Sequence, residues 1–176
     1  IATIDNLSNL DLRNNQIADI SPLAQNQKFV DSEPTIYLSN NKIVDLTPLS
    51  NFKNSDSIWL DNNLIEDVSP LTACTKLEHL SIKNNRISDL SVLSGMANLN
   101  RVLAVGNPVV KIDGLNLSSE RTGLSGEKYS SDSLLGGSIL SVSYTEQIDW
   151  AAAKSLKIDD LRVYDIPPRQ RAAMDD

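Results

Sequence analysis

The stretch LSNLDLRNNQIADISPL, residues 7–23, decides the fold, because four later segments repeat it. These segments are PTIYLSNNKIVDLTPL from Pro34, DSIWLDNNLIEDVSPL from Asp56, LEHLSIKNNRISDLSVL from Leu77 and LNRVLAVGNPVVKIDGL from Leu99. One asparagine marks each copy, and successive markers lie 26, 22, 22 and 22 residues apart, so the first interval carries a four-residue insertion, which we place in residues 25–33. Self-similarity at such a period predicts a solenoid of stacked coils.

Apolar residues occupy the same positions in every copy. Leu10 and Leu12 are two residues apart, which predicts a short strand with one face turned inward. Ile17, Ile20 and Leu23 supply apolar side chains to the rest of the coil. One coil cannot bury its own apolar face, but about three or more stacked coils form a continuous core. Five copies are therefore enough for a stable solenoid.

The marker asparagines are expected to form a structural ladder. A buried amide must use both its donors and its acceptor, and bonds to the backbone of its own and adjacent coils would satisfy this need. The residue before each marker is Asn or Gly, and both tolerate the positive φ of a tight turn. The expected ladder consists of Asn15, Asn41, Asn63, Asn85 and Asn107.

Ser-Pro and Thr-Pro pairs follow the apolar columns at 21–22, 47–48 and 69–70. Ser or Thr is a favoured N-cap and Pro a favoured first helical residue, so each pair predicts a 3₁₀ or one-turn helix on the convex side. An aspartate lies two residues before each pair. Stacked carboxylates could bind Ca²⁺ or could each bond the local turn, and we favour the local role for Asp19, Asp45, Asp67 and Asp89.

The repeat pattern decays after Asp113-Gly114, which divides the chain into a solenoid over 1–117 and a flanking or capping segment over 118–176. The second part opens with a Ser- and Gly-rich loop. A strand is expected at 138–144 and a short amphipathic helix at 145–157. We expect this segment to cover the open end of the last coil, because terminal repeats need a cap.

The LxLxxNxIxDIxPL strings, for example residues 10–23, resemble those of leucine-rich-repeat proteins, and the 22-residue period with D[ILV][ST]PL resembles bacterial internalins. The resemblance covers about residues 1–117. It implies an α/β-type horseshoe solenoid with parallel strands on the concave face, where protein ligands bind. It favours a secreted or cell-surface location, while the single cysteine is equally compatible with the cytosol.

Composition and residue types argue against several other functions. The net charge of −7 does not fit a nucleic-acid-binding surface, and no apolar run of 18 residues exists to insert into a membrane. Cys74 aligns with core positions and His79 with the opposite face, so the two cannot form a nucleophilic pair. One Cys and one His cannot make a zinc site. We therefore expect no enzyme activity, metal or cofactor.

Outward-facing strand positions form the candidate binding surface. Tyr37 and Trp59 fall in the same column of adjacent coils, and exposed aromatics beside charges are typical of binding hot spots. The expected partner-binding residues are Tyr37, Trp59, Arg13, Asp61, His79, Lys83, Arg101 and Leu103. The sequence thus predicts a protein-recognition module. A structural spacer within a longer protein, or the non-catalytic part of an enzyme or effector, stays an open alternative.

Overall fold

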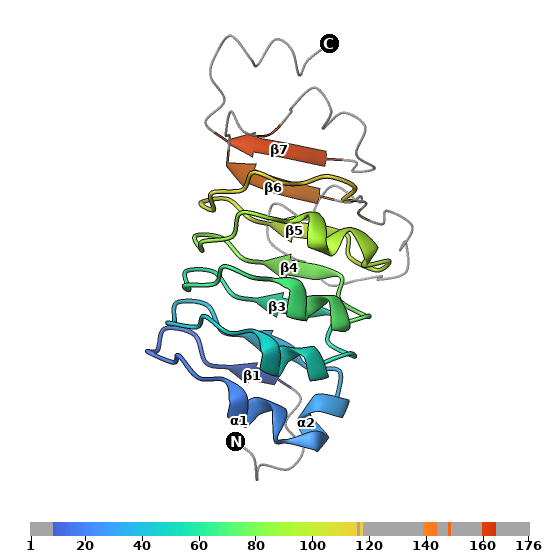
Figure 1. Ribbon diagram of the computed structural model, residues 1–176. Helices are drawn as coiled ribbons and strands as arrows, with labels where there is room; N and C mark the ends of the chain where they lie inside the picture. The colour runs from blue at the N-terminus through green and yellow to red at the C-terminus, as the bar shows by residue number, and fades with distance from the viewer. Residues whose placement is uncertain (1–8, 116, 118–138, 144–147, 149–159, 165–176) are drawn as a thin grey trace.

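A computed structural model describes residues 9–115, 117, 139–143, 148 and 160–164 of the 176-residue chain. Within these residues, seven parallel strands form one open sheet in chain order, each hydrogen-bonded to the next (Figure 1). Each strand is three to five residues long, as expected when a coil turns away after a short run. The strands are β1 (Asn9–Asp11), β2 (Thr35–Tyr37), β3 (Ser57–Trp59), β4 (His79–Ser81), β5 (Arg101–Leu103), β6 (Ile139–Ser143) and β7 (Asp160–Tyr164).

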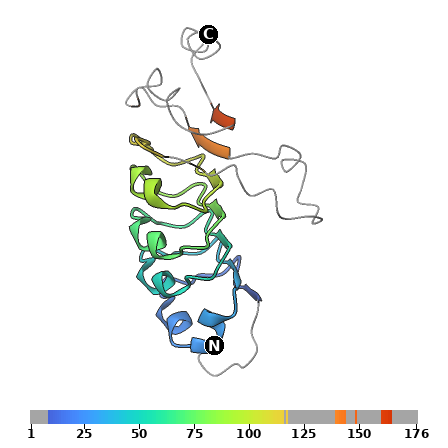
Figure 2. The ribbon, with the colours of Figure 1, turned by 90° about the vertical axis from the view of Figure 1, so that its right-hand side faces the viewer.

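Short helices lie on the side of the coils opposite the strands (Figure 2). The first coil has a four-residue α-helix, and the next three have 3₁₀-helices, as predicted from their short segments. The insertion folds as a further helix. Asn26 is its N-cap, and the side chain of Asn26 accepts a hydrogen bond from the Phe29 N–H. The helices are α1 (Ser21–Ala24), α2 (Gln27–Asp31), η1 (Thr47–Asn51), η2 (Ser69–Ala73) and η3 (Ser91–Gly95).

The helix starts differ from the prediction in one respect. Ser21, Thr47 and Ser69 are the first helical residues, and no capping bond comes from the side chain of the residue before them. The aspartate two residues earlier in each coil accepts the N–H of the helix's first residue, at 2.8 Å in four successive coils. A carboxylate reaches this N–H and also suits the positive end of the helix. The local role of the aspartates is therefore confirmed.

The core runs through the coils as one continuous cluster. The inward residues of coils two to four, such as Ile36, Leu60 and Ile87, are fully buried because each lies between two neighbouring coils. Leu12 and Ile17 of the first coil are only partly buried. Phe29 from the insertion packs edge-on against Phe52, with ring centroids 5.4 Å apart. The insertion thus adds a ring to the core rather than forming a free loop.

The marker asparagines join consecutive coils. Asn63 donates from Nδ2 to the carbonyls of Leu60 in its own coil and Leu38 in the preceding coil, both at 3.0 Å. Its Oδ1 accepts the Ile43 N–H of the preceding coil, also at 3.0 Å. Each amide therefore uses its donors and its acceptor in a region closed to water. The same pattern recurs at Asn41, Asn85 and Asn107.

Asn15 differs from the other marker asparagines. It is exposed, and among the residues that the structure describes its Nδ2 donates only to the Leu12 and Arg13 carbonyls of its own coil. The expectation of a buried amide was wrong at this position, because β1 is the first strand of the sheet and no earlier strand pairs with it among the described residues.

The turns after the strands need left-handed backbone. Asn14, Asn40, Asn62 and Asn84 have φ values of 53–60°, and Gly106 has φ of 82° at the same position in the fifth coil. Asn tolerates this conformation better than most residues, and Gly adopts it freely. A Cβ on Gly106 would lie 2.0 Å from Asn84 Oδ1, so the glycine also makes room for the neighbouring amide.

Two strands extend the sheet beyond the recognisable repeats. β6 occupies most of the range predicted as a strand and pairs in parallel with β5, and β7 pairs with β6. Leu140 and Val142 of β6 are fully buried against the core, and Ile148 is 5% exposed. The rest of the helix predicted at 145–157 lies outside the described residues. The last recognisable coil is therefore covered on its outer side by β6.

Candidate functional site

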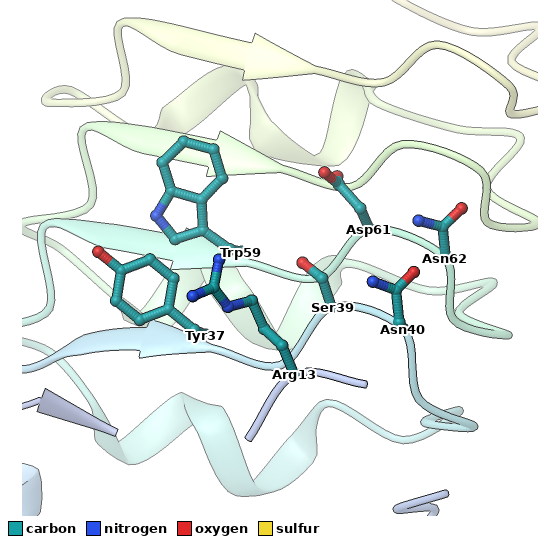
Figure 3. Close-up of a pocket in the computed structure, with 7 residues that line it drawn as sticks. All are labelled: Arg13, Tyr37, Ser39, Asn40, Trp59, Asp61 and Asn62. Atoms are coloured by element: carbon teal, nitrogen blue, oxygen red, sulfur yellow. The ribbon is translucent and has the colours of Figure 1, made fainter. Parts of the chain in front are cut away.

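The outward side chains of the strands, called the strand face below, correspond to the expected concave face. Tyr37 and Trp59 project from this face at the ends of β2 and β3, which places them directly opposite each other in register. Their ring centroids are 6.3 Å apart and their planes differ by 14°, within the range of offset aromatic pairs. Both side chains are half-buried. Figure 3 shows the two rings side by side with their faces toward the viewer.

Arg13 lies beside this pair. Its guanidinium carbon is 5.0 Å from the centroid of the Tyr37 ring, within cation–π range. Asp11 holds the guanidinium through bonds of 2.9 Å from Nε and 2.6 Å from Nη2. These bonds lower the pKa of Asp11 to about 2 and raise the pKa of Arg13. The side chain of Arg13 is thereby fixed over the ring although it is about half exposed.

Asp61 borders the other side of the aromatic pair. Its Oδ1 accepts bonds from Ser81 Oγ at 2.6 Å and from the Lys83 N–H at 2.8 Å, and its Oδ2 lies 3.7 Å from Lys83 Nζ. The side chain is only 17% exposed. These contacts fix the carboxylate and partly balance its charge, so Asp61 is a pre-oriented polar group rather than a free anion.

A small open pocket of about 310 Å³ lies on the strand face between these groups. Four residues that the sequence predicts to bind the partner come together here (Figure 3): Tyr37, Trp59, Arg13 and Asp61. Three further residues line the pocket, because only folding shows which turns border it. The added residues are Ser39, Asn40 and Asn62.

Three of the other candidate residues lie further along the strand face, away from this pocket. His79 and Arg101 are opposite each other at the starts of β4 and β5, and Leu103 ends β5 opposite Ser81. Burial is the main cause that lowers the pKa of His79, and the positive charge of Arg101 lowers it further. The imidazole is therefore neutral at pH 7. Lys83 contacts Asp61 and thus adjoins the pocket.

Three serines at outward-facing positions are covered rather than exposed. Ser39, Ser57 and Ser81 are 8%, 7% and 2% exposed. A serine is short, and Ser81, for example, lies between the larger Trp59 and Leu103 of the neighbouring strands. The exposed surface is therefore made by the larger residues alone.

The core cysteine has no reactive environment. Cys74 is fully buried, and its Sγ is 3.3 Å from the carbonyl oxygen of Leu49. Burial raises the pKa of the thiol to about 12, so the nucleophilic thiolate is scarce at neutral pH. No group of three or more His, Cys, Asp or Glu that could hold a metal ion occurs in the described part of the chain. The helices described in the structure are all too short to cross a membrane.

Comparison with known proteins agrees with this architecture. Family models for leucine-rich repeats match residues 6–26 and, as a pair of copies, residues 56–100. The chain therefore contains leucine-rich repeats. No curated protein matches the sequence.

Solved bacterial structures share the fold. An internalin (inlF) from Listeria monocytogenes is 24% identical with a TM-score of 0.56, and the match covers 94% of this chain and 49% of that one. The functional domain of InlJ from the same species is 18% identical with a TM-score of 0.57, covering 89% and 30%. A Leptospira interrogans leucine-rich-repeat protein is 26% identical with a TM-score of 0.51, covering 57% and 26%. The chain thus spans about half of the inlF structure and less of the other two.

Proposed function

We propose that the chain is a protein-recognition module whose partner binds the strand face around Tyr37 and Trp59. The observation that carries the proposal is the half-exposed aromatic pair, held in register by two adjacent strands and flanked by fixed charges. Tyr and Trp dominate the energy of many interfaces because they bury a large area with little loss of side-chain freedom. The leucine-rich-repeat family and the internalin-like fold support this proposal.

The surrounding residues would act as the rim of the interface. Arg13, Asp61 and Lys83 are close to the rings, whereas His79, Arg101 and Leu103 extend the surface toward β5. Rim charges change the association rate and the choice of partner more than the affinity. Leu103 would add apolar contact at the far end of the surface.

The size of the sheet limits the affinity. Seven strands about 4.8 Å apart, with three to five residues of about 3.3 Å each, give roughly 400 Å². A standard interface buries about 800 Å² on each partner. The strand face alone therefore supports weak binding, and tight binding requires additional surface.

We also propose that this module is not catalytic. Cys74 is buried with a raised pKa, and His79 lies on the strand face, so the chain's one Cys and one His do not form a nucleophilic pair. The Asp side chains before the helices are used as backbone acceptors. A hydrolase or transferase assay of the purified chain that gives turnover above background would contradict this proposal.

The binding proposal is tested with the double variant Tyr37→Ala and Trp59→Ala. Proteins captured by the wild-type chain are identified, and the dissociation constant of each purified candidate is measured against both proteins. We expect the double variant to bind at least about 30-fold more weakly, since a hot-spot aromatic contributes about 2 kcal/mol or more. The melting temperature should stay close to that of the wild type, because both rings are partly exposed.

The matched control is Val92→Ser, which changes a residue of η3 that is 38% exposed on the helical side. This variant should bind like the wild type. If the double variant keeps full affinity for every purified candidate, the strand-face proposal is wrong. A large loss of stability in the double variant would show that the rings serve the core instead.

A further inference from the structure

The repeat places a guanidinium over one ring of the aromatic pair but not over the other. Arg13 lies two residues after the end of β1, and its guanidinium carbon is 5.0 Å from the centroid of the Tyr37 ring in the next coil. Ser39 holds the equivalent position after β2, and the ring in the coil that follows it is that of Trp59. A serine is too short to reach over this ring. Trp59 is therefore left bordering the open pocket.

A carboxylate lines the same pocket as Trp59 (Figure 3). Asp61 Oδ1 accepts hydrogen bonds from the Ser81 hydroxyl and the Lys83 N–H, which keep the carboxylate in place. Asp61 Oδ2 is 3.7 Å from Lys83 Nζ, which is longer than an ordinary N–H···O hydrogen bond. Oδ2 can therefore accept a shorter bond from an incoming cation, and no bond to Oδ1 has to break.

A ring face beside a carboxylate favours a guanidinium group. The π-face of an aromatic ring is negative, and Trp attracts cations more strongly than Tyr or Phe. A guanidinium is planar and weakly hydrated, so it stacks on a ring while its N–H groups donate to a carboxylate at its edge. The chain already combines these three groups in Arg13, Tyr37 and Asp11. The net charge of −7 also attracts a basic partner.

We propose that this pocket binds an arginine side chain presented by a basic protein partner. The guanidinium of the partner stacks on Trp59 and donates to Asp61 Oδ2, in the place that Ser39 leaves open. Arg13 does not exclude a second guanidinium, because Asp11 binds it through two hydrogen bonds and balances its charge. The proposal rests on the proposed function, because it names the chemistry of the partner at the same face.

The test is an NMR titration of the full chain with the peptide acetyl-Gly-Gly-Arg-Gly-Gly-amide. The comparator carries citrulline in place of arginine, which replaces the guanidinium by a neutral group of the same shape. The indole N–H signal of Trp59 is followed, and Trp59→Phe identifies it as the signal that disappears. Salt at about 0.15 M screens the attraction to the net charge. We expect a saturable shift with arginine and at least about tenfold weaker binding of the citrulline peptide, because a neutral group loses the attraction to the ring and to the carboxylate.

Asp61→Asn keeps an oxygen acceptor but removes the charge, and it should weaken binding of the arginine peptide about tenfold. The matched control is Asp67→Asn, which changes the net charge equally but lies before η2 on the helical side. The control should bind like the wild type. Equal affinity for the two peptides, no saturable shift of the Trp59 signal, unchanged binding by folded Asp61→Asn, or an equal loss in both asparagine variants would overturn the arginine proposal. Those outcomes leave the proposed function intact if the Tyr37 and Trp59 double variant still loses its purified partner.

Discussion

At the scale of single residues, the same amino acid contributes differently to the free energy of unfolding in different coils. Asn63 is 5% exposed, and its side chain bonds backbone groups of two coils. Asn15 occupies the same repeat position but is exposed, and among the described residues its side chain bonds only carbonyls of its own coil. A buried group that loses its partner keeps the full cost of desolvation, whereas an exposed group bonds water instead. Comparing Asn63 with Asn15 therefore shows how burial changes the contribution of the same side chain to stability.

We predict that Asn63→Ala lowers the free energy of unfolding by at least about 3 kcal/mol, because two carbonyls and one N–H lose their partner at about 1–3 kcal/mol each. Asn15→Ala should cost less than about 1 kcal/mol. Urea denaturation followed by circular dichroism measures both. Similar losses for the two variants would show that the bonds between coils contribute little.

At the scale of elements, each helix depends on a residue outside it. Asp67 accepts the Ser69 N–H and the Ser69 hydroxyl, both at 2.8 Å, and so occupies the start of η2. Asp19 and Asp45 are equivalent in the neighbouring coils, and bonds to Ser21 and Thr47 lower their pKa. A depressed pKa means that this stabilisation is present above the ordinary pKa of the carboxyl and is lost as the pH falls through the lowered value.

We predict that Asp67→Ala destabilises the chain by about 1 kcal/mol, the usual cost of removing a helix cap. The melting temperature should fall by about 2–4 °C for a chain of this size. Asp67→Asn keeps an oxygen acceptor for the Ser69 N–H and should retain most of the stability. A fall in the asparagine variant as large as that in the alanine variant would assign the effect to the charge rather than to the hydrogen bond.

At the scale of the whole molecule, stability depends on how the two ends of the stack are covered. Val102 and Ala104 of the fifth coil are fully buried, and the next strand, β6, contributes the buried Leu140 and Val142. Removing β6 would expose an apolar coil and an unpaired strand edge. Open edges of this kind are sites of aggregation.

We predict that a chain ending at Asn116 aggregates or unfolds without cooperativity. Size-exclusion chromatography and thermal unfolding, compared with the full chain, measure both properties. A control chain ending after Tyr164 keeps β6 and β7 and should remain monomeric. A monomeric fragment 1–116 with a sharp unfolding transition would contradict the capping role and favour a separate function for residues 118–176.

The sequence by itself determined the repeat, the strand and helix positions and the inward columns, because the same local pattern recurs five times and each coil must bury the same face. It also paired Tyr37 with Trp59, since equal positions in adjacent coils must be neighbours. The tertiary structure decided which groups border that pair and which serines are covered, because these depend on side-chain size and rotamers. It also decided that β6 and β7 pair with the sheet and that Asn15 is exposed, because both depend on what stacks on each end of the coils.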